Sequence, residues 1–399
     1  MLASINTTLI SILAAIFTLG ILILIHELGH FLAARSVGIR VERFSIGFPP
    51  RFLTFRNKFD GLWMTIYVPW FLQRLFNAEM VEYRFRRRNP KAGDTEYSVS
   101  WTPLGGYVKM AGTIDESLDT AIHGKPWEFT SKKKWQQLLV ISAGVVMNTI
   151  LAWFLFSTIF LSSGVGEMTN STIVGSLSGT QSRPVYPAEA AGLLPGDKIL
   201  TVNDQKINEW DDLITVIHGL PGQEISIEWE RAGETKTATL TTVSEKVPTD
   251  DGVEQYGMIG IGPEVIQRSV GVWEAAKLGA QNTYNFGTLM VRSLGMLISG
   301  DASVKELGGP VAIAKMAGDM ARQGWLDVFY FMAILSVNLA FINILPIPGL
   351  DGGQFIIIAI EGMIRRPLPI KVKVVIQQVG MVLLLGLIIF VTIQDIAKL

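Results

Sequence analysis

The chain has 399 residues, of which 49% are hydrophobic and 17% charged, and its formal net charge is −1. It is too apolar for an ordinary soluble enzyme and too charged for a channel that lies wholly in a membrane, so we expect a membrane part joined to a soluble module. The balanced charge gives no indication of nucleic-acid binding. Because the chain has no cysteine, disulfides and thiolate metal sites are excluded, and a metal would have to be held by His and carboxylate side chains.

Four apolar stretches are each long enough to cross a bilayer as a helix, which takes roughly 20 residues. They lie at about 9–34, 138–162, 328–347 and 374–393. The residues before the first stretch have neither the positive charge nor the cleavage site of a signal peptide, so we expect this stretch to be retained. The sequence therefore predicts a multi-pass α-helical membrane protein with four transmembrane helices.

The charges of the two long loops predict the orientation of these helices. Residues 35–135 contain 17 Lys and Arg against 10 Asp and Glu, whereas residues 164–324 contain 12 against 20. Basic loops stay in the cytoplasm, and the lysine run at 132–134, beside the second span, carries the most weight. We therefore expect the loop 35–135 to be cytoplasmic, and the two termini and the acidic region to be outside.

The cytoplasmic loop contains three local features. Segment 61–76 is apolar and aromatic but too short to span a bilayer, so an interfacial helix or a loop is expected. The basic run at 84–91 suits a solvated face near anionic lipid. Residues 96–112 alternate in polarity on both sides of a Pro-Leu-Gly-Gly turn at 103–106, which predicts a β-hairpin on the side where the first span ends.

Residues 165–265 resemble a single PDZ domain with an α+β fold, without a second copy. Pro187 to Leu200 resembles the short helix, turn and strand of the PDZ signature, and a helix from Glu209 to about His218 precedes strands at 224–231 and 235–243. The last strand, at 256–262, resembles the carboxylate-binding strand and loop of bacterial PDZ domains, displaced as in a circular permutation. PDZ domains bind extended peptides or C-termini by strand addition. The predicted peptide groove consists of Tyr256, Gly257, Met258, Ile259 and Gly260.

These features divide the chain into four parts. They are an N-terminal membrane part at 1–164, the PDZ domain at 165–265 on the extracytoplasmic side, a helical connector at 266–324, and a C-terminal membrane part at 325–399.

A HELGH sequence in the first span predicts a zinc site. His26 and His30 are four residues apart, so they lie on one face of a helix about 6 Å apart along its axis. Two imidazoles in this arrangement can bind one Zn²⁺, and Glu27 beside them can take a proton from the attacking water. An ionisable group within a membrane span is costly and indicates a functional site.

Zinc in a hydrolase usually has three protein ligands and one open position. A metzincin would have Gly at position 33 and His at position 36, where this chain has Ala33 and Ser36, and Glu42 is too near for a thermolysin-like pattern. The third ligand is therefore expected elsewhere in the chain, at the same membrane depth as the two histidines.

Asp351 meets this requirement. The first and third spans both run from outside to inside, so the segment that follows the third span lies on the same side as the HELGH sequence. Pro346 and Pro348 stop the helix there, and Gly352 and Gly353 let the chain turn back. The Asp351 carboxylate can then point into the helix bundle as the third ligand.

Taken together, these motifs resemble the site-2 protease family of intramembrane zinc metalloproteases, and in particular the bacterial regulator of sigma-E protease group. The family's HExxH corresponds to residues 26–30, its NxxPxPxLDG to 343–352, its membrane-associated hairpin PLGGYVKM to 103–110, and its GGPV segment to 308–311. The resemblance covers nearly the whole chain. The chain departs from the family in a longer, more aromatic 59–90 segment and in having one PDZ domain where some relatives have two.

The resemblance implies a zinc metalloendopeptidase in the bacterial inner (plasma) membrane that performs regulated intramembrane proteolysis. Its expected partners are the lipid bilayer, a peptide or C-terminus at the PDZ domain, and single-span substrates such as a trimmed anti-sigma factor or a remnant signal peptide. We expect Gly105 and Gly106 to hold the unwound substrate as an added strand, and Asn343 and Asn338 to bind its backbone. The alternatives are an inactive membrane PDZ scaffold with a structural zinc site, and a zinc sensor or transporter.

Overall fold

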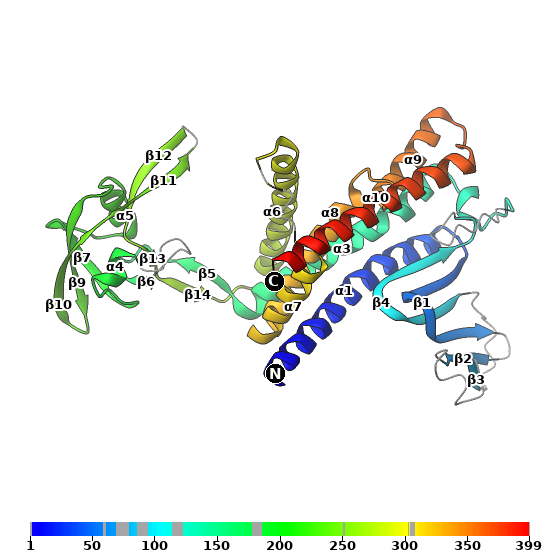
Figure 1. Cartoon of the computed structure of the whole chain (residues 1–399), viewed down its shortest axis with the longest axis horizontal. Helices are drawn as coiled ribbons and strands as arrows, with labels where there is room; N and C mark the ends of the chain where they lie inside the picture. Colours follow the sequence, from blue (N-terminus) through cyan, green and yellow to red (C-terminus); the bar gives the residue numbers. More distant parts are fainter. Residues whose placement is uncertain are drawn as a thin grey trace. The chain divides into compact units, whose positions relative to one another are not determined.

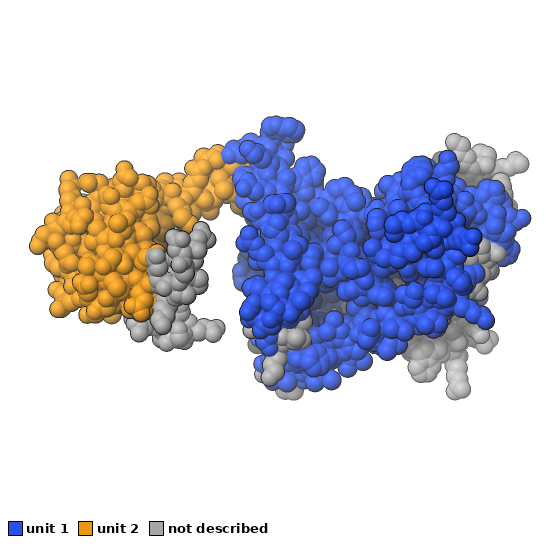
Figure 2. Space-filling model, turned by 90° about the horizontal axis from the view of Figure 1, so that it is seen from above, with its two compact units in different colours: residues 1–161, 271–399 blue, residues 162–270 orange. Residues whose placement is uncertain are grey.

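The computed structural model describes residues 2–58, 61–68, 80–85, 95–113, 123–177, 186–249, 252–301, 303 and 308–398. The chain forms two compact units (Figure 2). Unit 1 combines Met1–Leu161 with Gly271–Leu399, and unit 2 is Ser162–Val270. Most of the segment predicted as a connector therefore belongs to the same unit as the apolar helices.

Unit 1 is largely helical, and α1, α3 and α10 share a common tilt in Figure 1. Its helices are α1 (Leu2–Ser36), α3 (Lys134–Ser163), α6 (Val272–Ser299), α7 (Pro310–Gln323), α8 (Trp325–Ile344), α9 (Asp351–Ile364) and α10 (Ile370–Ala397), with a 3-10 turn at Phe129–Ser131. Four of them, α1, α3, α8 and α10, are long and apolar enough to cross a membrane. The four predicted stretches are thus helices of the required length and hydropathy, while their topology in a bilayer stays a prediction.

The helix α8 ends three residues before the predicted end of the third span. Its last residue is Ile344, and the backbone of Leu345 is already extended. The reason is local, since a residue that precedes proline is pushed out of the helical region, and Pro346 and Pro348 follow directly. The break leaves a short loop before α9, and this loop leads to Asp351.

The helices α1 and α3 approach each other closely through small residues. A methyl group added at Gly29 would collide with the backbone carbonyl of Ala143. Small residues of this kind allow helix backbones to come together where lipid offers no hydrophobic driving force. Beside this contact, Phe31, Val140 and Ile141 form part of one buried cluster.

A four-stranded antiparallel sheet, in the order β3-β2-β1-β4, follows α1. Its strands are β1 (Val41–Lys58), β2 (Gly61–Tyr67), β3 (Met80–Phe85) and β4 (Glu96–Met110). The start of β4 pairs with both halves of β1, because Glu96 lies opposite both Arg43 and Arg56. The end of β4 pairs with the first half of β1 alone, so residues 106–110 form an edge of this sheet within the described part of the chain.

The sheet changes two predictions for the loop 35–135. The chain does turn back between residues 99 and 106, as the predicted hairpin requires, but the two arms of that hairpin do not pair with each other. Residues 96–99 and 106–110 run in opposite directions on the two sides of residues 43–46, so the first half of β1 lies between them. β1 also reverses direction, near Gly47 with its φ of 87°, and its two halves flank the start of β4. The helix or loop predicted for 61–76 is wrong over residues 61–67, which form β2; positions 69–76 and 86–91 lie outside the described residues.

Unit 2 is an α+β domain built around a second four-stranded sheet, in the order β10-β9-β7-β8. Three two-stranded ladders complete it, β11 with β12, β13 with β6 and β14 with β5. Its core packs Ile199, Leu213, Ile227 and Trp229 between the sheet and α5. Its elements are β5 (Val165–Met168), β6 (Val174–Leu177), α4 (Pro187–Ala190), β7 (Lys198–Val202), β8 (Gln205–Lys206), α5 (Trp210–His218), β9 (Glu224–Arg231), β10 (Glu234–Thr241), β11 (Val243–Thr249), β12 (Gly252–Met258), β13 (Ile261–Pro263) and β14 (Val265–Arg268).

The helices and the first strands of unit 2 lie close to their predicted positions, and the last strand does not. The helix α5 begins at Trp210 because Glu209 forms a capping box with Asp212. The strand predicted for 256–262 is divided: β12 ends at Met258 and β13 begins at Ile261. Gly260 lies at the break, and its φ of 82° is in the left-handed region, which bends the chain away from regular strand geometry.

A buried ion pair closes one side of unit 2. Arg231 donates hydrogen bonds to both oxygens of Asp197, each at 2.6 Å, and the Leu194 N–H donates a third at 2.8 Å. Burial raises the pKa of the Asp197 carboxyl, but the bonds from Arg231 and Leu194 lower it more, so the pKa lies below its usual value. A carboxylate with a depressed pKa stabilises the fold above its unfolded-state pKa of about 3.9 and loses that effect as the pH falls through its folded-state pKa.

The substitution Asp197→Asn should therefore loosen unit 2 at neutral pH and remove this pH dependence. We expect hydrogen-exchange protection factors in β7 and β9 of the full-length protein to fall several-fold at pH 7. They should no longer show the additional decrease that the unsubstituted protein shows below about pH 4. Glu234→Gln, at an exposed position of β10, is the matched control. Unchanged protection in Asp197→Asn would contradict this role of the ion pair.

Candidate metal centre

The two histidines of α1 lie side by side within the helix bundle. His26 and His30 are one turn apart and are both buried, with 7% and 6% of their surface exposed. Their Nε2 atoms are 3.3 Å apart, and their rings meet edge to face with centroids 4.8 Å apart. The helical spacing thus directs two nitrogen atoms to one point.

The carboxylate of Asp351 lies at the same point. Its Oδ2 atom is 3.1 Å from His26 Nε2 and 3.2 Å from His30 Nε2. The three atoms form a nearly equilateral triangle, although more than 300 residues of the chain separate the histidines from Asp351. In the described part of the chain, these three side chains are the group with the geometry to hold a metal ion.

Close packing of the loop between α8 and α9 places Asp351 there. Asp351 is the first residue of α9, and a methyl group added at Gly352 would collide with the carbonyls of Leu345 and Ile344. Gly353 lies equally close to the backbone of Ile347. The two glycines therefore let the first turn of α9 pack directly on the end of α8, which turns Asp351 toward α1.

A buried carboxylate anchors the other end of α9. Glu361 is 2% exposed and receives hydrogen bonds from Lys134 of α3 at 2.7 Å and from the Leu368 N–H at 2.8 Å, and it also pairs with Lys373 of α10. Burial raises the pKa of Glu361, but the bonds from Lys134, Lys373 and Leu368 lower it more, so the carboxyl is held ionised. This network ties α9, and with it Asp351, to α3 and α10.

The far side of each imidazole contacts α3. His30 Nδ1 is 2.8 Å from the backbone oxygen of Val140, and His26 Nδ1 is 3.2 Å from the side-chain amide of Asn148. A carbonyl oxygen can only accept, so His30 Nδ1 carries the proton and its Nε2 presents a lone pair to the triangle. His30 Nε2 and the Asp351 carboxylate oxygen are then two acceptor atoms 3.2 Å apart, an arrangement that a metal ion between them would stabilise.

The dimensions of the triangle fit zinc. A point equidistant from its three atoms lies about 1.9 Å from each, close to the Zn–N length of roughly 2.0–2.1 Å. Two imidazoles and one carboxylate match the donor set of catalytic zinc sites, which leave a fourth position open. We therefore assign His26, His30 and Asp351 as the residues that would hold the metal, which is the set predicted from the sequence.

The glycine at position 144 lets α3 come this close, and the sequence analysis did not identify it. A methyl group on Gly144 would lie 2.5 Å from His30 Nε2 and 2.6 Å from His26 Cε1, so no larger residue fits without displacing both rings. The sequence does contain a signal for it, namely an Ala-Gly pair within an apolar span that is followed by an asparagine one helical turn later. An asparagine within a span, such as Asn148, is unusual enough to indicate a site.

A cavity of about 740 Å³ opens beside the triangle. Its lining includes His26, His30 and Asp351 together with the predicted residues Glu27, Gly105, Gly106 and Asn343. Asn338 does not line it, because five residues along α8 turn a side chain by about 140° relative to Asn343. The structure thus gathers every predicted residue of the membrane site except Asn338.

The edge of the sheet forms one wall of this cavity. Residues 105–110 of β4 all line it, and the Val108 N–H is a hydrogen-bond donor to the Glu27 carboxylate. Gly106 lies against the same side chain, because a methyl group added there would be 3.3 Å from Glu27 Cγ and 3.2 Å from Ile23. The carboxylate of the HELGH sequence and this edge of β4 are therefore immediate neighbours.

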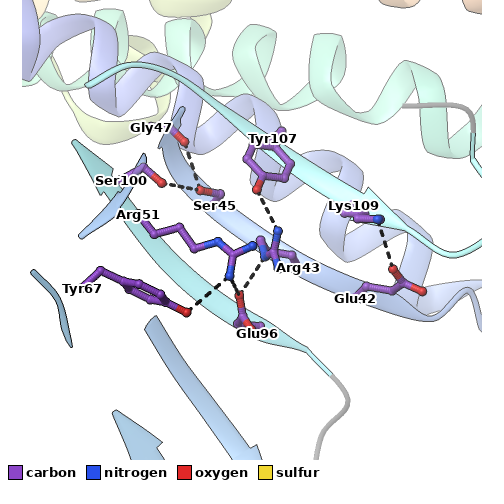
Figure 3. Close-up of polar contacts among 10 residues, drawn as sticks. All are labelled: Glu42, Arg43, Ser45, Gly47, Arg51, Tyr67, Glu96, Ser100, Tyr107 and Lys109. Carbon is purple, nitrogen blue, oxygen red and sulfur yellow. Dashed lines mark hydrogen bonds and ion pairs between the residues drawn. The ribbon is translucent and has the colours of Figure 1, made fainter. Parts of the chain in front are cut away.

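A polar network holds this edge in place (Figure 3). Arg43 Nε donates to Glu96 at 2.8 Å and Arg43 NH1 donates to the Tyr107 hydroxyl at 3.2 Å, while Arg51 lies 3.6 Å from Glu96. The two arginines come from different halves of β1, and Glu96 comes from the start of β4. The network therefore links both halves of β1 to the cavity wall at Tyr107.

The predicted peptide groove of unit 2 is closely packed at two of its residues. Tyr256 stacks on His218 at the end of α5, with ring centroids 4.7 Å apart, and Gly257 lies against the backbone carbonyls of Ile217 and Leu220. Ile259 is buried in the domain core. The peptide-binding role of residues 256–260 stays a prediction.

A zinc-type ligand set within apolar helices, with a carboxylate beside it, defines the class of membrane-embedded metallohydrolases. The profile of peptidase family M50 matches residues 14–70 and 76–387, which is most of the chain. The chain belongs to peptidase family M50, and it is a zinc metalloprotease of the site-2 protease type.

Three curated relatives match this chain over nearly the full length of both proteins. A Clostridium perfringens protein whose name describes a zinc metalloprotease is 32% identical over 386 residues, covering 96% of this chain and 98% of its own. The Enterococcus faecalis protein eep, named as a protease, is 30% identical over 469 residues, covering 97% and 99%. The regulator of sigma-E protease RseP of Escherichia coli is 29% identical over 474 residues, covering 94% and 96%. These similarities favour the protease over the scaffold and transporter alternatives.

A solved structure also matches part of the chain. The PDZ domain of an SdrC-like protein from Listeria monocytogenes covers 25% of this chain and 93% of its own, at 20% identity and a TM-score of 0.19. That TM-score is too low to assign a fold to unit 2.

Gly144→Ala should disturb the metal centre although it replaces none of the ligand residues. The added methyl group would press on both imidazoles, so we expect zinc affinity to fall by at least about tenfold, the lower limit found for changes around metal ligands. Zinc content of the purified protein, measured by mass spectrometry, checks this. Gly386→Ala in α10, where nothing lies within 4 Å, is the matched control. A full zinc content in Gly144→Ala would show that α3 is not pressed against the rings.

Proposed function

We propose that this protein hydrolyses peptide bonds within membrane-spanning segments of other proteins. The observation that carries the proposal is the meeting of His26, His30 and Asp351, on helices that can cross a bilayer or lie between such helices, beside a cavity that also contains Glu27. Each of these groups is costly in an apolar bundle, and together they form the donor set and base of a zinc peptidase.

Glu27 acts as the general base and acid. Zinc, when bound by His26, His30 and Asp351, polarises a substrate carbonyl and makes a bound water more acidic. Glu27 takes the proton from the attacking water and passes it to the leaving amine. The Val108 N–H orients the carboxylate for this transfer by holding it from the side of the sheet.

The edge of β4 holds the substrate. A helical substrate must unwind before its peptide groups can be cut, and each unpaired group in lipid costs several kcal/mol. The edge at 106–110 offers backbone groups to an extended chain, as in strand addition. Asn343, which is buried and lines the same cavity, adds a side-chain amide for the substrate backbone.

The setting that we propose is regulated proteolysis in a bacterial inner membrane. The basic loop 35–135 is cytoplasmic and unit 2 is extracytoplasmic, as the distribution of Lys and Arg predicts. Unit 2 is a PDZ domain that binds a peptide or a C-terminus. The substrates are single-span proteins, such as an anti-sigma factor already trimmed outside the membrane or a remnant signal peptide, and the name of the Escherichia coli relative supports the first class.

Glu27→Gln and Asp351→Ala should separate chemistry from metal binding. Glu27→Gln keeps the shape of the side chain and removes the base, so cleavage of a model single-span substrate in liposomes should fall by about 10²–10⁴ while zinc content is unchanged. Asp351→Ala should lower both. A zinc chelator should stop cleavage by the unsubstituted protein.

Retained cleavage in Glu27→Gln would exclude Glu27 as the base. Unchanged zinc in Asp351→Ala would mean that another residue supplies the third ligand. Cleavage that persists in the chelator would contradict the proposed function as a whole.

Gly106→Val should slow cleavage without loss of zinc. The new side chain would collide with the backbone oxygen of Ser45 in the paired strand and press on Ile23 and Glu27, which shifts the edge of β4 relative to the base. A displacement of about 1 Å at a reacting group costs up to a hundredfold in rate. Cleavage rate and zinc content are measured together on the same preparation. Gly20→Val, on α1 where nothing lies within 4 Å, is the control. A normal rate in Gly106→Val would separate the sheet edge from catalysis.

A further inference from the structure

Asn148 is a fully buried side chain for which the proposed mechanism has no use. It lies on α3, and its backbone oxygen accepts a hydrogen bond from Ser336 of α8 at 2.8 Å, so it stands where α1, α3 and α8 meet. Its side-chain Nδ2 is 3.2 Å from His26 Nδ1, and its Oδ1 has no hydrogen-bond partner among the described residues. An unpaired amide oxygen at this depth costs about 1–3 kcal/mol, so its position needs an explanation.

The chemistry of His26 supplies one. A neutral imidazole carries one proton, on either nitrogen. With the proton on Nε2, the Nδ1 atom is an acceptor and the Asn148 Nδ2 group donates to it. When Nε2 gives its lone pair to zinc, the proton must be on Nδ1, and the group opposite must accept.

Asparagine can serve both arrangements. A half-turn of the amide exchanges Nδ2 and Oδ1, and it would bring the unpaired oxygen to face His26 Nδ1. Ligating histidines usually donate their second N–H in this way, which fixes the tautomer and the orientation of the ring. His30 has the same support from the Val140 carbonyl, a backbone group.

We propose that Asn148 is a positioning residue for zinc, which accepts the Nδ1–H of His26 and holds its Nε2 toward the metal. The two histidines are thus supported differently. His30 is held by a backbone carbonyl, which a substitution of the Val140 side chain would not remove, whereas the orientation of His26 depends on the side chain of Asn148. The proposal rests on the proposed ligand role of His26.

Three substitutions test the proposal by zinc affinity, measured by chelator competition on the full-length protein in detergent. Asn148→Leu keeps the branching of the side chain but cannot accept a hydrogen bond, so affinity should fall about ten- to a hundredfold. Asn148→Asp retains an acceptor and should stay within about threefold of the unsubstituted protein. Ser336→Ala removes a hydrogen bond from the same helix junction without touching the amide, and it should leave zinc affinity unchanged.

A packing role for Asn148 predicts the reverse order, because leucine suits an apolar junction and a lone carboxylate does not. Affinity retained in Asn148→Leu, or lost equally in Asn148→Asp, would therefore overturn the proposal. If the unsubstituted protein binds no zinc, the proposed function fails instead, so the two failures are distinguishable.

Nitrogen-15 NMR of labelled histidine tests the same point should Asn148→Leu not fold. The chain has four histidines, so His26 can be assigned by substitution. In the zinc-loaded protein, His26 Nδ1 should be protonated and hydrogen-bonded. An unprotonated Nδ1, which would mean that the metal binds the other nitrogen, would overturn the proposal.

Discussion

The contact between α1 and α3 is the constraint on which the rest of the membrane unit depends. Gly29 and Gly144 bring the two backbones so close that α3 itself forms the wall behind both imidazoles. At that distance the Val140 carbonyl and the Asn148 amide reach the Nδ1 atoms, and the Nε2 atoms have one direction left in which to point. Larger side chains at positions 29 and 144 would hold the two helices further apart. The two imidazoles would then lose their partners on α3 inside an apolar bundle, at a cost of several kcal/mol each.

The same helix also holds the third corner of the triangle. Lys134, at the start of α3, pairs with Glu361 of α9, and the first residue of α9 is Asp351. Thus α3 fixes the histidines through its middle and the carboxylate through its end. Since the ligands come from opposite ends of the sequence, this shared scaffold explains how they meet within 3.3 Å. The sequence of α3 contains none of the ligands and nevertheless determines their geometry.

The features that could be predicted from the sequence are those whose signal lies within one short segment of the chain. The His26 and His30 pair is read from helical spacing alone, and the four apolar stretches are read from length and hydropathy. Asp351 required one further step, which was matching the ends of two spans. The pairing of β4 with β1 could not be read locally: the Pro-Leu-Gly-Gly sequence predicts that the chain turns back, but it does not show that the first half of β1, about 50 residues earlier, lies between the two arms. Nor could Gly144, whose importance depends on which helix faces it.

The neighbouring positions of Glu27 and the β4 edge connect these two kinds of structure. A zinc site built on helices is rigid, but a substrate helix offers it no accessible peptide bond. A sheet edge can bind an extended chain, but it has no chemistry of its own. Because the Val108 N–H bonds to Glu27 and Gly106 packs on it, the distance between the edge strand and the base is set by direct contact within one unit. In the proposed mechanism, the hydrogen bonds that hold a substrate along 106–110 both keep it unwound and bring it within reach of the base. Substrate capture and cleavage therefore depend on the same backbone, that of residues 106–110.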